Sequence, residues 1–218
     1  MAFAASIPAT PQAPGASRFV VVLDAAHGGS DPGAQLGKQA EKDLTLALSV
    51  KLRSLLMARG IAVVTTRESD AAVFADRRAE IANHANAAAC LNLHAALASA
   101  KSGPAVHLFF SSLPATKDVR FVPWRTAQSA WIVRSTALAS ALNSALTQAG
   151  VTVTLGRTAL PAIDSMACPA VAVEIAPQRQ SDADGADDAD FEAKVAEALA
   201  AALVEWRSDG AQFGDRRP

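Results

Sequence analysis

The sequence has little net charge, no long apolar run and few cysteines, and each of these features narrows the range of functions. Its 20 lysine and arginine residues nearly balance 21 acidic residues, which gives a formal net charge of −1. Because nucleic-acid-binding proteins normally carry a basic excess, we expect no nucleic acid partner. No apolar run approaches the roughly 20 residues that cross a bilayer, so we expect a chain that does not span a membrane.

The only two cysteines, Cys90 and Cys168, leave two interpretations open. Both lie in or beside expected buried strands, where a free cysteine packs as a small hydrophobic residue. In an oxidising compartment the same pair forms a disulfide if the two Cα atoms come within about 7 Å of each other. Core packing is the default prediction, and the disulfide is the alternative.

Length and composition favour one domain, because 218 residues that are 50% hydrophobic bury one good core. We assign residues 1–17, rich in proline and alanine, to a flexible N-terminal tail. Residues 18–207 form the domain, and residues 208–218 form a charged, flexible C-terminal tail. The first residues lack the basic region and long apolar segment of an intact signal peptide, so they are either a simple tail or the stub left by signal cleavage.

Apolar runs and helical repeats alternate along the chain, which predicts an α/β fold. Residues 19–23 are five consecutive β-favouring residues and suit a strand buried on both faces. Apolar residues at helical spacing begin after Glu41 and stop at Gly60, and Asp70 is placed to cap the next helix. We therefore expect a twisted, mostly parallel central sheet flanked by helices on both faces. Further strands are expected at 61–66, 90–94, 105–110 and 170–174, further helices at 126–149 and 191–206, and loops at 111–125 and 181–190.

Three expected strands end in side chains that can bind a metal or transfer a proton. The first strand leads into His27, another ends in His94, and a third ends in Glu174. Ligands of open α/β sheets bind at such carboxyl ends. Glu41 lies in the first turn of a helix, where the helix dipole favours the ionised carboxylate. Two histidines and a carboxylate suit a catalytic zinc with an open position for water, and Glu174 would then be the base.

Six segments together resemble the zinc-dependent N-acetylmuramoyl-L-alanine amidases, which cleave bacterial cell-wall peptidoglycan. The resemblance covers residues 19–206, and the segments occur in the order of that family. They are LDAAHGGSDPGA at 23–34, EKDLTLAL at 41–48, TTRESD at 65–70, RAEIAN at 78–83, LNLHA at 91–95 and PAVAVEIA at 169–176.

The resemblance implies a ligand set, a reaction and a location. His27, Glu41 and His94 match the ligands of one Zn²⁺ per chain, and Glu174 matches the catalytic glutamate. The implied reaction is hydrolysis of the amide bond between N-acetylmuramic acid and the L-alanine of the stem peptide. Its substrate, peptidoglycan, implies a periplasmic or extracellular protein from which a signal peptide has been removed.

Two other functions stay open, and several polar residues are left out of the site. The alternatives are another zinc peptidase acting on cell-wall peptides and an inactive peptidoglycan-binding module. We interpret Arg67 and Arg78 as ion-pair partners of Asp70, Asp76 or Glu80. His84 and His107 are assigned structural roles, because neither lies at the carboxyl end of a strand. We expect an open site, since loop 111–125 is too short to hold the zinc-blocking helix of some family members. We also expect a monomer. The sequence does not identify an activator or a cell-division partner.

Overall fold

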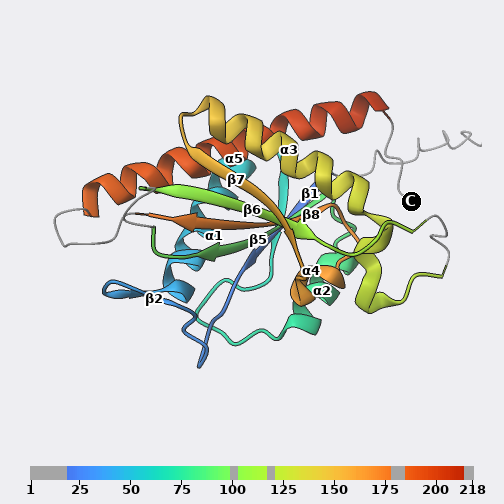
Figure 1. Cartoon of the computed structure of the whole chain (residues 1–218), viewed down its shortest axis with the longest axis horizontal. Coiled ribbons are helices and arrows are strands. Elements are labelled where there is room, and N and C mark those ends of the chain that lie inside the picture. The colour runs from blue at the N-terminus through green and yellow to red at the C-terminus, as the bar shows by residue number, and fades with distance from the viewer. Residues whose placement is uncertain (1–18, 99–102, 117–120, 178–184, 214–218) are drawn as a thin grey trace, which may run out of the picture.

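The computed structural model describes residues 19–98, 103–116, 121–177 and 185–213, which form a six-stranded sheet between two layers of helices (Figure 1). The strand order is β4-β1-β5-β8-β6-β7, and a separate two-stranded hairpin is formed by β2 and β3. All neighbouring strands of the large sheet are parallel except β6 and β8, which are antiparallel. The strands are β1 Val20–Ala25, β2 Gln35–Leu36, β3 Gln39–Ala40, β4 Ala62–Thr65, β5 Ala89–Ala95, β6 Ala105–Ser111, β7 Thr152–Thr158 and β8 Ala170–Ala176.

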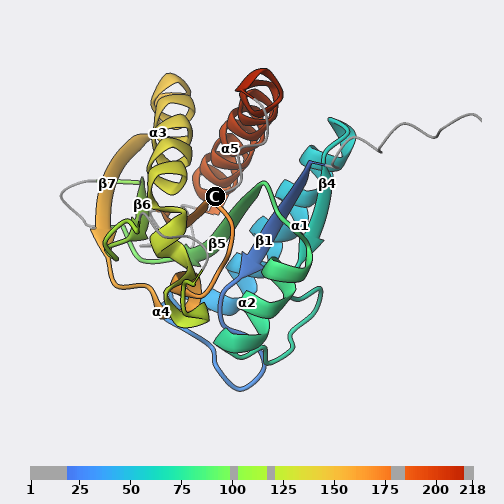
Figure 2. The ribbon, with the colours of Figure 1, turned by 90° about the vertical axis from the view of Figure 1, so that its right-hand side faces the viewer.

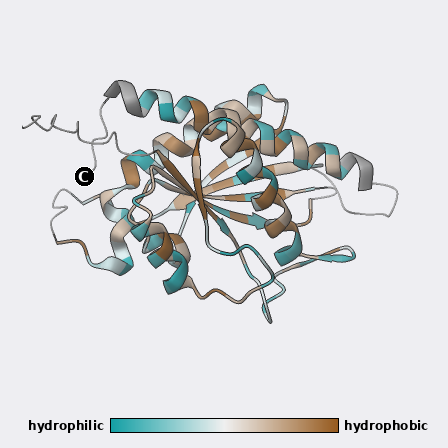
Figure 3. Ribbon diagram, turned by 180° about the vertical axis from the view of Figure 1, so that it is seen from behind, coloured by the Kyte–Doolittle hydropathy of each residue, from teal (hydrophilic) through white to brown (hydrophobic). Residues whose placement is uncertain are grey.

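Helices cover the two faces of the sheet unequally (Figure 2). Three long helices, α1 (Glu41–Ala58), α3 (Ile132–Gln148) and α5 (Gly185–Phe213), pack on one face through leucines, valines and alanines of the larger core. Three shorter elements, α2 (Ala75–His84), α4 (Pro161–Asp164) and the 3-10 helix η1 (Trp124–Ala130), lie on the other face. The predicted α/β architecture with helices on both faces is therefore confirmed, and Figure 3 shows the apolar strands between the two layers.

Side-chain alternation determines which strand residues reach the second face. On β5, Leu91 and Leu93 point into the larger core, whereas Cys90 points toward α2 and α4. Since successive side chains of a strand point to opposite faces, Asn92 and His94 share the face of Cys90. The polar residues of β5 thus lie on the face that carries the shorter helices.

Several predicted elements differ in their limits or contacts. Asp70 does not cap α2, which begins after Phe74 without a side-chain cap. The Asp70 carboxylate instead accepts a hydrogen bond from the Gly29 N–H (2.7 Å) and pairs with the Lys42 ammonium (2.6 Å). The helix expected at 126–149 is divided into η1 and α3, because Gln128 is buried and bonds to the chain before β8.

The end of the chain also differs from the sequence-based prediction. A loop was predicted at 181–190, but helix α5 begins at Gly185, so residues 185–190 are helical. Residues 181–184 lie outside the described residues. The helix ends at Phe213, beyond the expected end at Trp206 and inside the segment assigned to the C-terminal tail. Residues 1–17, the predicted N-terminal tail, lie outside the described residues. The division into tails and domain stays a prediction.

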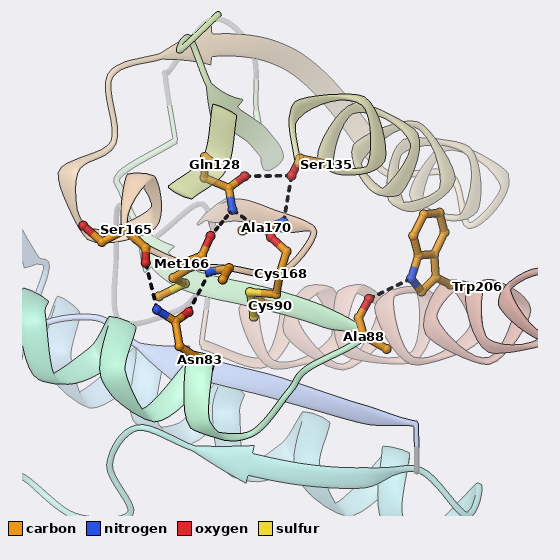
Figure 4. The surroundings of a disulfide bond; sticks show 11 residues. Asn83, Ala88, Cys90, Gln128, Ser135, Ser165, Met166, Cys168, Ala170 and Trp206 are labelled. Atoms are coloured by element: carbon orange, nitrogen blue, oxygen red, sulfur yellow. Dashed lines mark hydrogen bonds between the residues drawn. A yellow bond between two sulfur atoms is a disulfide. The ribbon is translucent and has the colours of Figure 1, made fainter. Parts of the chain in front are cut away.

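Cys90 and Cys168 form a disulfide (Figure 4). The default prediction, that they are free cysteines packed in the core, is therefore wrong. Their Cα atoms are 6.2 Å apart, and the bond ties β5 to the segment before β8. Gln128 donates hydrogen bonds to the carbonyl oxygens of Met166 (2.6 Å) and Cys168 (2.7 Å). Asn83 of α2 bonds to the same segment at Ser165 and Ala167. These contacts fix the start of β8 against β5, and the other ends of these two strands carry Glu174 and His94.

Candidate metal centre

The chain leaves β1 in a sharp turn that presents His27. The backbone of His27 is left-handed (φ 60°), and Gly28 follows with φ 127°. A Cβ atom at Gly28 would lie 2.3 Å from the carbonyl oxygen of Ala71, so only glycine fits the turn there. His27 Nδ1 hydrogen-bonds to Asp31 Oδ2 at 2.8 Å, which points Nε2 toward the carboxylate of Glu41.

Two buried arginines hold this turn by its carbonyl oxygens. Arg67 donates to the carbonyls of Ala25 (2.9 Å) and Ala26 (3.0 Å), and Arg78 donates to those of Ala25 (2.6 Å) and His27 (2.7 Å). The predicted partners of Arg78 were wrong, whereas Arg67 interacts electrostatically with Asp70, one of the acids predicted for it. Arg78 pairs with Asp24 at 2.5 Å, and the hydrogen bonds of Arg67 run to backbone carbonyls and to the hydroxyl of Thr45, because both guanidinium groups face the buried end of β1.

Glu41, the first residue of α1, lies almost fully buried between the two histidines. Its Oε1 accepts the Ala95 N–H (3.1 Å), and its Oε2 accepts the Ala34 N–H (2.9 Å). Burial raises the pKa of this carboxyl. The hydrogen bonds from His94, Ala34 and Ala95 and the charge interaction with His27 outweigh burial and lower the pKa from 4.5 to about 2. The carboxylate is therefore ionised, as a metal ligand must be.

The structure brings His27, Glu41 and His94 together. His94 Nδ1 lies 2.8 Å from Glu41 Oε1, and His27 Nε2 lies 3.1 Å from Glu41 Oε2. One donor atom from each residue lies within 4.8 Å of the other two. At Gly33, a Cβ atom would come within 2.6 Å of His27 Cδ2 and 2.7 Å of Glu41 Oε2, so the turn leaves room for this group only because residue 33 is glycine. Two imidazole nitrogens and one carboxylate oxygen are a donor set that fits zinc.

Glu174 lies beside this triad on β8. Its register partner on β5 is His94, so both side chains point to the same face of the sheet. Glu174 is half-buried, whereas the four apolar β8 residues that precede it are buried. Glu174 is thus a half-buried carboxylate on the strand next to His94, one of the three side chains that could hold a metal ion.

Two residues near the triad were not assigned to the site from the sequence. Asp31 was read only as part of a turn, yet its carboxylate binds the outer nitrogen of His27. His107 was assigned a structural role, yet it is the register partner of Glu174 on β6. The sequence signal for Asp31 was its spacing of four residues from His27. The expectation that loop 111–125 leaves the site open stays a prediction, and its residues 117–120 lie outside the described part of the chain.

Comparison with known proteins assigns the matched region to one family model. The model described as N-acetylmuramoyl-L-alanine amidase matches residues 21–205. The chain is 35% identical over 89 residues to the germination-specific N-acetylmuramoyl-L-alanine amidase of Bacillus subtilis, covering 34% of this chain and 38% of that protein. It is 40% identical over 78 residues to AmiA of Escherichia coli, covering 35% and 27%. The matches thus span well under half of these curated relatives.

Solved structures of similar fold extend over nearly the whole described chain. The catalytic domain of CwlV from Bacillus (Paenibacillus) polymyxa aligns with a TM-score of 0.67 and 24% identity, covering 87% of this chain and 98% of that one. AmiC2 of Nostoc punctiforme aligns with a TM-score of 0.69 and 23% identity, covering 89% and 99%. At this level of identity the likeness establishes the fold. None of the helices in the described ranges has both the length and the apolar character of a membrane span.

Proposed function

Because this chain belongs to the N-acetylmuramoyl-L-alanine amidase family, we propose that it hydrolyses the amide bond between N-acetylmuramic acid and L-alanine in peptidoglycan, with a zinc ion at its centre. The observation that carries the proposal is the convergence of His27, Glu41 and His94 within 4.8 Å beside Glu174. In this assignment the three residues of the triad hold the zinc. Glu174 is the general base and acid.

In the proposed reaction, the zinc held by the triad and the Glu174 carboxylate have different roles. Zinc, when bound, would supply a water molecule with a pKa lowered to about 7 and would polarise the scissile carbonyl. Glu174 takes a proton from the attacking water and passes it to the nitrogen that leaves as the bond breaks. The neighbouring Glu41 cannot take this role, because its oxygens are already held by His94, Ala34 and Ala95.

Two further features support an action outside the cytoplasm. The Cys90–Cys168 disulfide suits an oxidising compartment, since thiols in the cytosol are normally kept reduced. Peptidoglycan, the proposed substrate, lies in the same compartment. We therefore place the protein in the periplasm or at the cell exterior.

Digestion of purified peptidoglycan with and without a chelator tests the proposal. We expect the zinc-loaded protein to release peptides, EDTA to stop the release, and added Zn²⁺ to restore it. Undiminished release after complete zinc removal would contradict the metal assignment. Co-sedimentation with peptidoglycan without any release would instead identify an inactive binding module.

Replacing Asp31 by alanine should weaken zinc binding about 10–100-fold, because the carboxylate that orients His27 is lost. Competition with a zinc-binding dye measures the effect. Asp31 is 65% exposed in its side chain, so we expect little change in stability. The exposed Asp209 on α5 supplies the control, Asp209→Ala, and equal zinc affinity in the two variants would remove Asp31 from the site.

A further inference from the structure

His107 lies next to Glu174 because β6 runs antiparallel to β8. Register pairing places His94 beside Glu174, Glu174 beside His107, and His107 beside Thr154 of β7. These four residues form one row across four neighbouring strands. Paired residues of a sheet point to the same face, and neighbouring strands lie about 4.8 Å apart. The row therefore continues the site from the triad, past Glu174, toward the edge strand β7.

The His107 ring is held in place and half-exposed on this face. Its Nδ1 hydrogen-bonds to the Thr154 hydroxyl at 2.6 Å, so Nε2 is the ring atom left to bind a partner. Phe109 lies on the same face, with its ring centroid 6.5 Å from that of His107. A Cβ atom at Gly156 would lie 3.0 Å from Phe109 Cδ1, so the Phe109 ring covers the glycine of β7. The row thus offers a hydrogen-bonding group with an aromatic ring beside it.

The chemistry of the proposed reaction determines which half of the substrate lies along this row. Glu174 can protonate the leaving nitrogen only if that nitrogen lies on the Glu174 side of the scissile carbon, and the carbonyl oxygen then lies on the side of the triad. The leaving group therefore extends from Glu174 away from the triad. The strands that it meets in this direction are β6 and β7, with His107 and Phe109 half-buried on the same face as Glu174.

We propose that His107, oriented by Thr154, binds the peptide half of the substrate. Nε2 forms a hydrogen bond with a backbone amide or carboxylate group of the stem peptide, and Phe109 contacts an adjacent apolar side chain. The muramic acid half then lies on the opposite side of Glu174. This inference rests on the proposed amidase function and adds the binding site for the leaving peptide.

Steady-state kinetics of His107→Ala on two muramoyl substrates tests the inference. One substrate carries the full stem peptide, and the other carries a single L-alanine. We expect the KM for the full substrate to rise about tenfold, because one hydrogen bond to bound substrate is lost, with little change in kcat. The KM for the short substrate should change much less. His107→Gln, which keeps a hydrogen-bonding group, should fall between the wild type and His107→Ala.

The thermal midpoint of each variant shows whether a change in KM comes from a loss of stability. His84→Ala is the control variant, because His84 lies on α2 and hydrogen-bonds to the Glu80 carbonyl. An unchanged KM for the full substrate in both His107 variants would overturn the inference. An equal rise for both substrates would also overturn it, since a general distortion does not depend on peptide length. Lack of turnover by the wild type would instead refute the proposed function.

Discussion

Glu174→Gln lowers turnover of muramoyl-peptide by about 10²–10⁴-fold, because the group that takes and returns the proton is lost. The side chain lies next to His94 in the sheet, but the group of residues that could hold a metal ion is His27, Glu41 and His94, without Glu174. Zinc content and thermal stability should therefore match the wild type. Initial rates and metal analysis of the same purified samples measure both quantities.

The matched control for this variant is Glu205→Gln, a carboxylate exposed on α5. Its turnover should equal that of the wild type. Near-normal hydrolysis by Glu174→Gln would remove Glu174 from the reaction. Loss of zinc together with activity would show that Glu174 is a ligand, which would change the assigned set.

Arg78→Met destabilises the fold by about 3–5 kcal/mol, because it leaves the buried Asp24 carboxylate without its ion-pair partner. Asp24 would retain only its hydrogen bonds from Thr66 (2.6 Å) and Asn92 (2.7 Å). The same change removes the donors that hold the carbonyls of Ala25 and His27. Urea unfolding measured by circular dichroism gives the free energy of unfolding.

The neighbouring Arg77 provides the control, because its guanidinium is 61% exposed and pairs with Glu80 on the helix surface. Arg77→Met should cost no more than about 1 kcal/mol. If the two variants unfold at the same urea concentration, the buried pair does not hold the turn as described. If Arg78→Met loses more unfolding free energy than Arg77→Met but less than about 3 kcal/mol, water reaches Asp24 in the variant.

The parts of the site that follow from strand ends were predictable from the sequence. An apolar strand followed by a polar side chain places that side chain at the carboxyl edge of a parallel sheet. This rule placed His27, His94 and Glu174 at one edge, and the helical repeat after Glu41 placed the carboxylate at the start of α1. The family motifs add the order of these elements, and the matched family model agrees with them.

The contacts that depend on strand direction and on long-range pairing were not predictable. His107 was set aside because it lies within a strand and not at its carboxyl end, and the antiparallel pairing of β6 with β8 places this mid-strand residue beside Glu174. The Cys90–Cys168 disulfide joins residues 78 positions apart, and no sequence pattern measures the distance between two such cysteines. Arg78 was matched to nearby acids of its own segment, whereas its partner Asp24 lies on β1, 54 positions away.

The masses of the fragments released from a purified muramoyl-peptide show which bond this protein cleaves. We expect two products that together gain one water molecule: muramic acid with a free lactyl carboxylate, and a peptide that begins with the free amine of L-alanine. Their formation should require zinc and should fail in His94→Ala, which lacks one of the three donors. Fragments cut within the peptide would rule out amidase activity, and the same two products from zinc-free protein would rule out a catalytic zinc.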